Sequence, residues 1–158
     1  VQENTNISAR RHHKKLIFLD NAWEYDNVMS RIRELGIRTP SQRQLVKNLS
    51  GGNQQKVILG RWLAEKIKVM LLDEPTRGID VGAKAEIYDI IYRLAAEGIG
   101  VVAVSSDLPE VLGISDRILV FSEGELVGEV KRADATPEAV LSMALPRESK
   151  HSKVMVKN

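Results

Sequence analysis

Apolar residues follow two patterns in the middle of the chain. Two short uninterrupted runs, at residues 69–72 and 100–104, are typical of parallel strands that are buried on both faces. Between them, four apolar residues at helical spacing predict a helix over about residues 82–97. These four are Ile87, Ile90, Ile91 and Leu94. A strand, a helix and a strand in this order predict a βαβ unit of the α/β class, with parallel strands.

Helical patterns also precede the first apolar run. We expect one helix over residues 21–36, a short one over 41–46 and a third over 50–66, for which Ser50 is a favourable N-cap. The third helix should turn one apolar face toward the core. This face would consist of Val57, Ile58, Trp62 and Leu63.

The C-terminal part of the chain has a different pattern. A short helix is expected over residues 107–113. Two strands, over 117–122 and 125–130, surround Glu123-Gly124 and predict a hairpin. A last helix should begin after Thr136, which is a favourable N-cap.

Composition restricts the function. The chain has 158 residues, of which 43% are hydrophobic and 28% charged, as in soluble globular domains. It has no cysteine, which excludes disulfides, thiolate catalysis and cysteine-ligated zinc. A formal net charge of +2 does not by itself indicate nucleic-acid binding. No apolar run approaches the roughly 20 residues that a membrane span needs.

Polar residues gather where the expected elements begin or end. Asp73 and Glu74 directly follow the first apolar run, and parallel α/β sheets bind ligands outside the carboxyl ends of their strands. Asp73 could therefore hold a metal ion and Glu74 could orient or deprotonate a water, although a solvated acidic turn is the alternative. Ser50-Gly51-Gly52 opens a helix, where glycines let a phosphate approach the backbone and unpaired N–H groups attract it.

Together these segments resemble the motifs of ATP-binding cassette (ABC) transporters. Residues 49–56 resemble the signature motif, residues 69–74 the Walker B strand, and Gly78-Ile79-Asp80 the D-loop, in the family's order and spacing. Residues 53–56 and 73–84 are similar to the second cassette of two-cassette monosaccharide importers, most of all to the L-arabinose importers. The resemblance extends from about residue 7 nearly to Pro146.

The resemblance implies an α/β fold that is part of a P-loop NTPase, with parallel strands, flanking helices and a C-terminal β-hairpin. Residues 1–19 would form a basic and polar N-terminal segment, and we expect residues 1–15 to be a solvated or disordered arm. Residues 20–66 would be part of the helical signature subdomain. Residues 67–146 would supply the Walker B and D-loop part of the ATPase core, and 147–158 a loose tail.

The resemblance also implies roles for single residues. Asp73 would help to hold Mg²⁺ through water, Glu74 would polarise the attacking water, and Asp80 would communicate between two cassettes. The signature residues would bind the γ-phosphate of an ATP seated on a facing cassette. These residues are Ser50, Gly51, Gly52 and Gln54.

The implied cofactors are ATP and Mg²⁺. The implied partners are a facing ATP-binding cassette, membrane permease subunits and, indirectly, a periplasmic sugar-binding protein, with no nucleic acid among them. Such a chain would lie peripherally on the cytoplasmic face of a bacterial inner membrane.

Two features depart from the family pattern. No G-x-x-x-x-G-K-[ST] phosphate loop occurs among the 158 residues, so we expect the C-terminal third or less of a two-cassette subunit, inactive in isolation. Without the strand that precedes such a loop, residues 69–72 should lie at an exposed apolar edge.

Ser106 occupies the position of the family's switch histidine, which predicts a slow or mainly structural site at this Walker B strand. The three histidines, His12, His13 and His151, lie outside the predicted core.

Two other interpretations stay open. Heads of DNA-repair or chromosome-maintenance ATPases also carry a signature and a Walker B strand on a lobe without a phosphate loop, and the basic residues 10–15 would suit DNA. No sustained heptads lead into this lobe, as such heads require. The chain could also be a truncated, inactive interaction module that lends its signature to a complete cassette.

Overall fold

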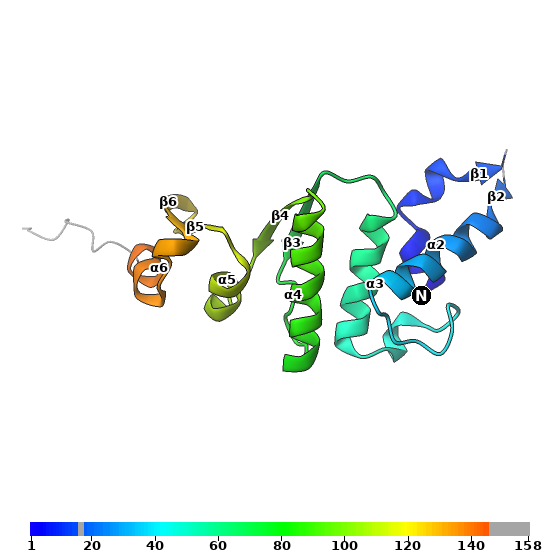
Figure 1. The fold of residues 1–158 in the computed structure, drawn as a ribbon, viewed down its shortest axis with the longest axis horizontal. Coiled ribbons are helices and arrows are strands. Elements are labelled where there is room, and N and C mark those ends of the chain that lie inside the picture. Colours follow the sequence, from blue (N-terminus) through cyan, green and yellow to red (C-terminus); the bar gives the residue numbers. More distant parts are fainter. Residues whose placement is uncertain (16–17, 146–158) are drawn as a thin grey trace, which may run out of the picture. The chain divides into compact units, whose positions relative to one another are not determined.

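The structure, a computed structural model, describes residues 1–15 and 18–145 (Figure 1). These residues form two compact units, the first Val1–Ser106 and the second beginning at Asp107. The expected loose tail, residues 147–158, lies outside the described residues. In the described part of the chain, no helix is both long enough and apolar enough to cross a membrane.

The N-terminal residues pack onto the first unit. Helix α1 (Gln2–Asn6) and the 3₁₀ turn η1 (Ala9–His12) lead to a small antiparallel pair, β1 (Lys14–Lys15) and β2 (Phe18–Leu19). Thr5, Asn6 and Ala9 are at most 1% exposed. The Asn6 amide donates to the carbonyl oxygen of Glu24 over 2.9 Å. The expected solvated or disordered arm is therefore wrong, because polar residues of α1 find hydrogen-bond partners on the next helix.

Helix α2 (Asn21–Glu34) agrees with the prediction. The Asp20 carboxylate caps it by accepting from the backbone N–H of Trp23 over 3.2 Å. Gly36 follows it with φ 58°, the left-handed conformation that glycine adopts at low cost. The predicted helix over residues 41–46 is wrong, since only the 3₁₀ turn η2 (Val46–Asn48) forms there. So short a segment gains too few hydrogen bonds to offset the cost of helix nucleation.

Helix α3 (Gly51–Leu63) contacts α1, α2 and the later helix α4 (Val81–Ala96). Its buried residues are Gly52, Lys56, Val57, Leu59 and Gly60. Ile58 and Trp62, which were expected in the core, are 42% and 49% exposed. The expectation was wrong for these two because the helix packs through the face that carries its glycines, where neighbouring helices approach most closely.

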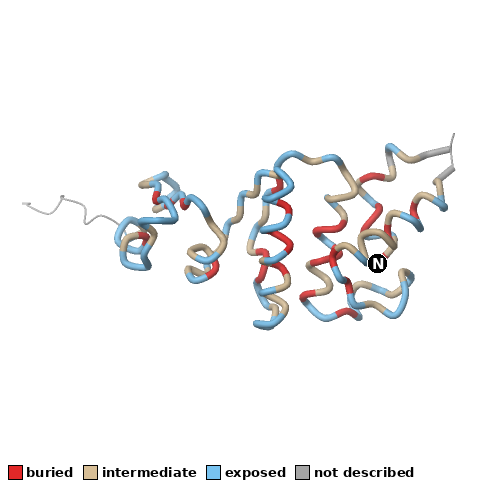
Figure 2. The backbone as a smooth tube through the Cα atoms, in the orientation of Figure 1, coloured by how far each residue is buried: buried red, intermediate tan, exposed pale blue. Residues whose placement is uncertain are grey.

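Strands β3 (Val69–Asp73) and β4 (Gly100–Val104) pair in parallel, and Asp73 lies opposite Val104. The predicted helical stripe of α4 is buried, with Ile87 0% exposed (Figure 2). The predicted burial of both strand faces is wrong. Met70 is 3% exposed, but its neighbour Leu71 is 76% exposed. Among the described residues β3 and β4 pair only with each other, so both outer edges of this pair are unpaired and one face is exposed.

The second unit confirms the predicted hairpin. Strands β5 (Arg117–Ser122) and β6 (Glu125–Lys131) pair antiparallel around Glu123 and Gly124, whose φ values are 51° and 85°. Helix α5 (Leu108–Ile114) precedes them, and the turn η3 (Arg132–Asp134) and helix α6 (Pro137–Ala144) follow. Thr136 caps α6 by accepting from the backbone N–H of Ala139 over 3.1 Å. The unit has its own core of Ile118, Val120, Val130 and Val140.

Candidate nucleotide site

Glu74 and Ser106 lie together at the carboxyl ends of the parallel strands. The backbone N–H of Glu74 donates to the carbonyl oxygen of Val104 over 2.8 Å, which extends the pairing of β3 and β4 by one residue. The Glu74 carboxylate accepts from the backbone N–H of Ser106 over 3.0 Å. Glu74 has φ 47°, a left-handed conformation that is unfavourable for a residue with a side chain and is typical of functional sites. The strand ends therefore hold this carboxylate in a defined place.

Asp73 is an exposed carboxylate at the last position of β3. In the part of the chain that the structure describes, no group of three or more His, Cys, Asp or Glu residues is placed to hold a metal ion. A single carboxylate of this kind is compatible with Mg²⁺, which keeps several waters and uses one or two carboxylates together with substrate phosphates. Asp73 can thus supply one contact to a hydrated Mg²⁺, and a nucleotide would have to supply the others.

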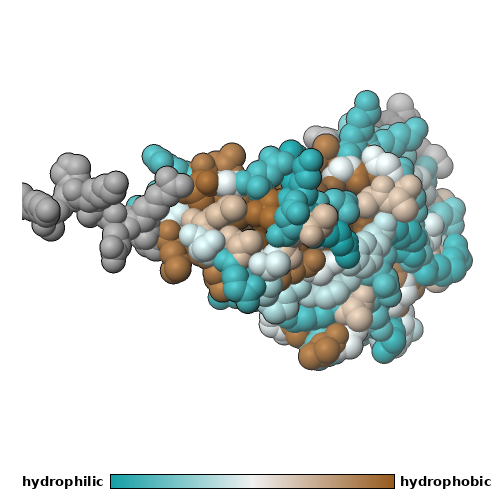
Figure 3. Space-filling view, turned by 60° about the vertical axis from the view of Figure 1, so that its left-hand side comes forward, coloured by the Kyte–Doolittle hydropathy of each residue, from teal (hydrophilic) through white to brown (hydrophobic). Residues whose placement is uncertain are grey.

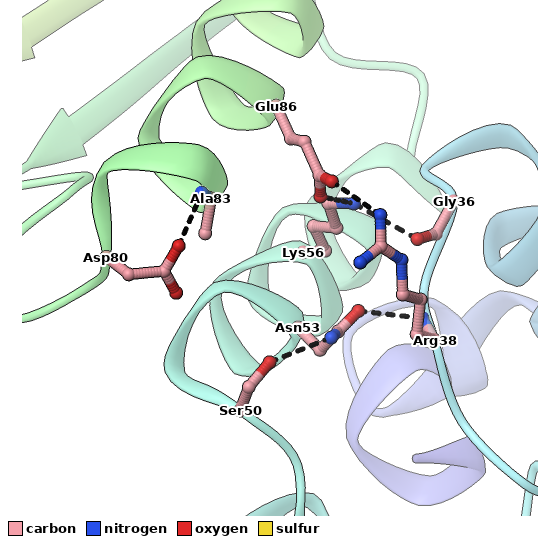
Figure 4. A network of polar contacts seen from close by, with 8 residues as sticks. All are labelled: Gly36, Arg38, Ser50, Asn53, Lys56, Asp80, Ala83 and Glu86. Carbon is pink, nitrogen blue, oxygen red and sulfur yellow. Dashed lines mark hydrogen bonds and ion pairs between the residues drawn. The ribbon is translucent and has the colours of Figure 1, made fainter.

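Ser50 occupies the N-cap position of α3, as predicted, but its hydroxyl does not cap the helix. The Ser50 Oγ instead accepts from the Asn53 amide over 2.9 Å, and the Asn53 carbonyl oxygen accepts from the backbone N–H of Arg38 over 2.7 Å (Figure 4). The Ser50 side chain therefore leaves the first N–H groups of α3 uncapped. The positive end of a 13-residue helix, with an exposed Ser50 and Gly51 beside it, can attract a phosphate.

The signature glycines also permit close helix packing. A Cβ atom on Gly52 would lie 2.5 Å from the Cβ of Ala83, at the start of α4. A Cβ atom on Gly51 would lie 3.0 Å from Cγ2 of Ile79 in the D-loop segment. Such distances are shorter than van der Waals contact between carbon atoms. The sequence suggested only that glycine lets a phosphate approach, and the structure adds that Gly52 lets α3 pack on α4.

The remaining predicted site residues make local contacts. The Gln54 amide donates to the carbonyl oxygen of Leu49 over 2.8 Å, at the start of its own helix. The Asp80 carboxylate caps α4 by accepting from the backbone N–H of Ala83 over 2.9 Å (Figure 4). Both residues lie beside the Ser50 segment, since Gly51 adjoins Ile79 and Gly52 adjoins Ala83. The structure thus brings the signature and the D-loop segment together.

An ion-pair network that the sequence did not suggest joins α3 to α4. The side chain of Lys56 is 5% exposed, and its Nζ donates to Glu86 over 2.7 Å and to the carbonyl oxygen of Gly36 over 3.0 Å (Figure 4). Arg38 pairs with the other Glu86 oxygen over 2.8 Å. The hydrogen bond from Lys56, followed by its positive charge and that of Arg38, lowers the pKa of Glu86. Buried ions need such pairing to offset lost hydration.

A second missed contact reaches the Walker B turn. The Gln55 amide donates to the carbonyl oxygen of Pro75 over 2.8 Å.

One sequence signal could have indicated the ion-pair network: Lys56 lies four residues from both Gly52 and Gly60, so it shares the face with which the glycines pack. A lysine on such a face requires a buried partner. Gln55 gives no comparable signal, since glutamine is common on exposed helix surfaces.

Comparison with known proteins agrees with these motifs. The family described as "ABC transporter" matches residues 1–77. The arabinose import ATP-binding protein AraG of Pectobacterium atrosepticum is 63% identical over 148 residues, which are 93% of this chain and 29% of the relative. AraG of Shigella flexneri is 58% identical over 94% of this chain and 30% of its own length. This chain therefore spans about three tenths of these relatives.

Solved structures agree on the fold. A dimeric bacterial ABC transporter cassette superimposes with a TM-score of 0.70 at 23% identity, over 83% of this chain and 56% of that one. At this identity the likeness concerns the fold alone. The carboxylates at the strand end and the helix that opens with Ser50-Gly51-Gly52 fit the family of the relatives of high identity. The chain belongs to the ABC transporter family of ATP-binding proteins.

Proposed function

We propose that this chain is part of the ATP-binding, energy-coupling subunit of an importer for a monosaccharide, with L-arabinose as the transported sugar. One observation carries the ATPase proposal. Glu74 lies at the carboxyl ends of two parallel strands, where its carboxylate accepts a hydrogen bond from the backbone N–H of Ser106. The sugar follows from the relatives that are named for arabinose import.

The described residues support two separate tasks in ATP hydrolysis. Glu74 orients a water for attack on the γ-phosphate of a nucleotide bound to its own cassette, and Asp73 contacts the hydrated Mg²⁺ that neutralises the phosphates. Ser50, Gly51 and the open first turn of α3 bind the γ-phosphate of an ATP held by a facing cassette. The Gly-rich phosphate-binding loops for both nucleotides must come from other segments, because this sequence contains no such loop.

This proposal also includes the partners. The facing cassette presents the second half of each nucleotide site, permease subunits receive the conformational change, and a periplasmic binding protein delivers the sugar. The chain would then lie peripherally on the cytoplasmic face of the bacterial inner membrane. The basic segment near residue 10 gives little support to a DNA-binding head, since the Arg10 guanidinium is paired with the carboxylate of Glu24, with Nη2 3.1 Å from Oε2.

The test is ATP-driven sugar uptake by the complete transporter. The full-length subunit, its permease and its binding protein are reconstituted in vesicles, and uptake of L-arabinose is compared with that of other pentoses and hexoses. We expect uptake that requires ATP and Mg²⁺, prefers L-arabinose and is lost with Glu74→Gln together with Ser50→Ala. Sugar uptake that is indifferent to both substitutions would contradict the ATPase role, and preference for another sugar would contradict only the choice of arabinose.

A further inference from the structure

We propose that Gln55 is a positioning residue that couples the two nucleotide sites to which this chain contributes; this inference rests on the proposed function. The Gln55 amide donates to the carbonyl oxygen of Pro75 over 2.8 Å. Pro75 directly follows Glu74, and Gln55 lies one helical turn beyond Gly51 on α3. One hydrogen bond thus joins the helix that meets the facing cassette's nucleotide to the turn that holds the water-orienting carboxylate.

The turn around Pro75 is well placed to transmit a displacement. Pro75 is buried and Thr76 is 1% exposed, so this segment is packed and has little room for independent movement. The proline ring fixes φ near −65°, which restricts the direction of the preceding peptide and of the Glu74 backbone. Glu74 is itself held in an unfavourable left-handed conformation by its two hydrogen bonds to the β4 end. A small shift of the Pro75 carbonyl therefore changes the direction of the Glu74 side chain.

Two contacts join helix α3 to α4. The contact between Gly52 and Ala83 leaves no space for a Cβ atom, and the Lys56–Glu86 ion pair joins the same two helices over 2.7 Å. These two contacts restrict sliding of α3 along α4. When Ser50 binds a phosphate, the resulting displacement of α3 reaches the Glu74 turn through Gln55, which hydrogen-bonds to that turn.

Gln55 does not touch the nucleotide in this account, so its effect must be measured as coupling. The experiment determines ATP turnover by the complete transporter for wild type, Ser50→Ala, Glu74→Gln and the double variant. The same four proteins are then made with Gln55→Met, which keeps the size of the side chain but removes its N–H donor. Melting temperatures of all eight proteins show that they are folded.

Turnover by two independent sites adds, so uncoupled sites would lose the same absolute turnover on Ser50→Ala with or without Glu74→Gln. Without the Gln55 change, we expect these two absolute losses to differ about fivefold or more, the usual scale of coupling between sites. With Gln55→Met the two losses become equal. Gln55→Lys retains an N–H donor and restores the difference. If Gln55→Met lowers the melting temperature, Gln55→Glu, which places an acceptor against the Pro75 carbonyl, replaces it in the same series.

The proposal is wrong if the two absolute losses are equal in the wild-type series. It is also wrong if their difference survives Gln55→Met, or Gln55→Glu where that variant replaces it. Loss of coupling without rescue by Gln55→Lys would also contradict a role of the donated hydrogen bond. A wild-type transporter that hydrolyses no ATP would instead overturn the proposed function, and the present inference would fall with it.

Discussion

The carboxylate of Glu74 accepts a hydrogen bond from the backbone N–H of Ser106 over 3.0 Å, across the ends of two adjacent parallel strands. The resemblance to ABC cassettes predicts a switch histidine at the position of Ser106, and in this chain the backbone N–H of Ser106 holds the carboxylate. A backbone donor fixes the orientation of Glu74 but cannot exchange a proton as an imidazole can. The site can therefore orient water through Glu74 while lacking an acid–base side chain at position 106.

Glu74→Gln should lower ATP hydrolysis at its own site while leaving the fold intact. The amide oxygen can still accept from Ser106, but it cannot act as a base. We expect a loss of about 100-fold or more, the range found for general acid–base groups. The measurement is turnover by the full-length subunit in which the facing cassette's own water-orienting carboxylate has been removed. Glu97→Gln, at an exposed position after α4, is the matched control, and equal turnover of the two variants would contradict the role of Glu74.

Gly52→Ala should destabilise the packing of α3 on α4. The new Cβ atom would lie 2.5 Å from the Cβ of Ala83, so the helices must separate. Overpacking of this kind costs about 1–3 kcal/mol of unfolding free energy. Chemical denaturation of the full-length subunit measures the loss, and Ala83→Gly in the same protein should restore most of it.

Gly113→Ala is a suitable control for this pair, because a Cβ atom on Gly113 meets no heavy atom within 4 Å. It should leave stability unchanged or raise it slightly, since alanine favours helices. Full stability of Gly52→Ala, or failure of Ala83→Gly to rescue it, would show that the glycine is not required for helix packing.

The Lys56–Glu86 pair should make stability depend on acid. Lys56 and Arg38 lower the pKa of Glu86 below its ordinary value of 4.5. The unfolded chain then binds the proton more readily than the folded one, so the contribution of the pair is present above pH 4.5 and is lost as the pH falls through the lower, folded pKa. Thermal melts between neutral and acidic pH measure this loss.

Glu86→Gln removes the titrating carboxylate and should flatten that part of the pH profile. It should also lower stability at neutral pH, because the buried Lys56 ammonium would lose its charged partner. Glu97→Gln should leave the profile unchanged. A Glu86→Gln profile that still falls as steeply as the wild type below pH 4.5 would contradict the contribution of this pair.

The 158-residue chain by itself should associate rather than melt as a stable monomer. The open face of the β3–β4 pair includes Val69, Leu71, Val102 and Val104, each at least 52% exposed. Apolar surface, brown in Figure 3, lies among the hydrophilic regions. Leu71→Lys should reduce association, measured by sedimentation at several concentrations, because a charge on an open strand opposes further pairing. A sharp, reversible, concentration-independent melt of the unsubstituted chain would contradict this expectation.

Several elements could be predicted from sequence because their signals are local. The stripe of α4, the cap at Thr136 and the hairpin turn at Glu123-Gly124 each depend on neighbours only a few residues away. The exposure of Leu71 could not be read from its run of apolar neighbours, because the pattern reports which surfaces favour burial, not which segments cover them. Likewise, α1 is polar in sequence and is buried through hydrogen bonds with α2.

The same distinction applies to the site. Asp73, Glu74 and Ser50 follow from motif positions, and the structure places Glu74 beside Ser106. The Gln55–Pro75 and Lys56–Glu86 contacts join residues 20 and 30 positions apart. The spacing of Lys56 from two glycines indicates that it needs a buried partner, but no local pattern identifies Glu86 or Pro75 as the partners. Their geometry depends on the packing of α3 against α4, which only the three-dimensional arrangement determines.

The most direct test of the central claim, that this chain serves two nucleotide sites, is Ser50→Ala in the complete two-cassette transporter. The hydroxyl lies at the open N-terminus of α3 and is expected to bind a γ-phosphate held by the facing cassette. The measurement is steady-state ATP turnover in a background with Glu74→Gln, so that only the facing cassette's site reports. We predict a loss of about tenfold or more, as for removal of a donor to a developing negative charge. Unchanged turnover in that background would contradict the account.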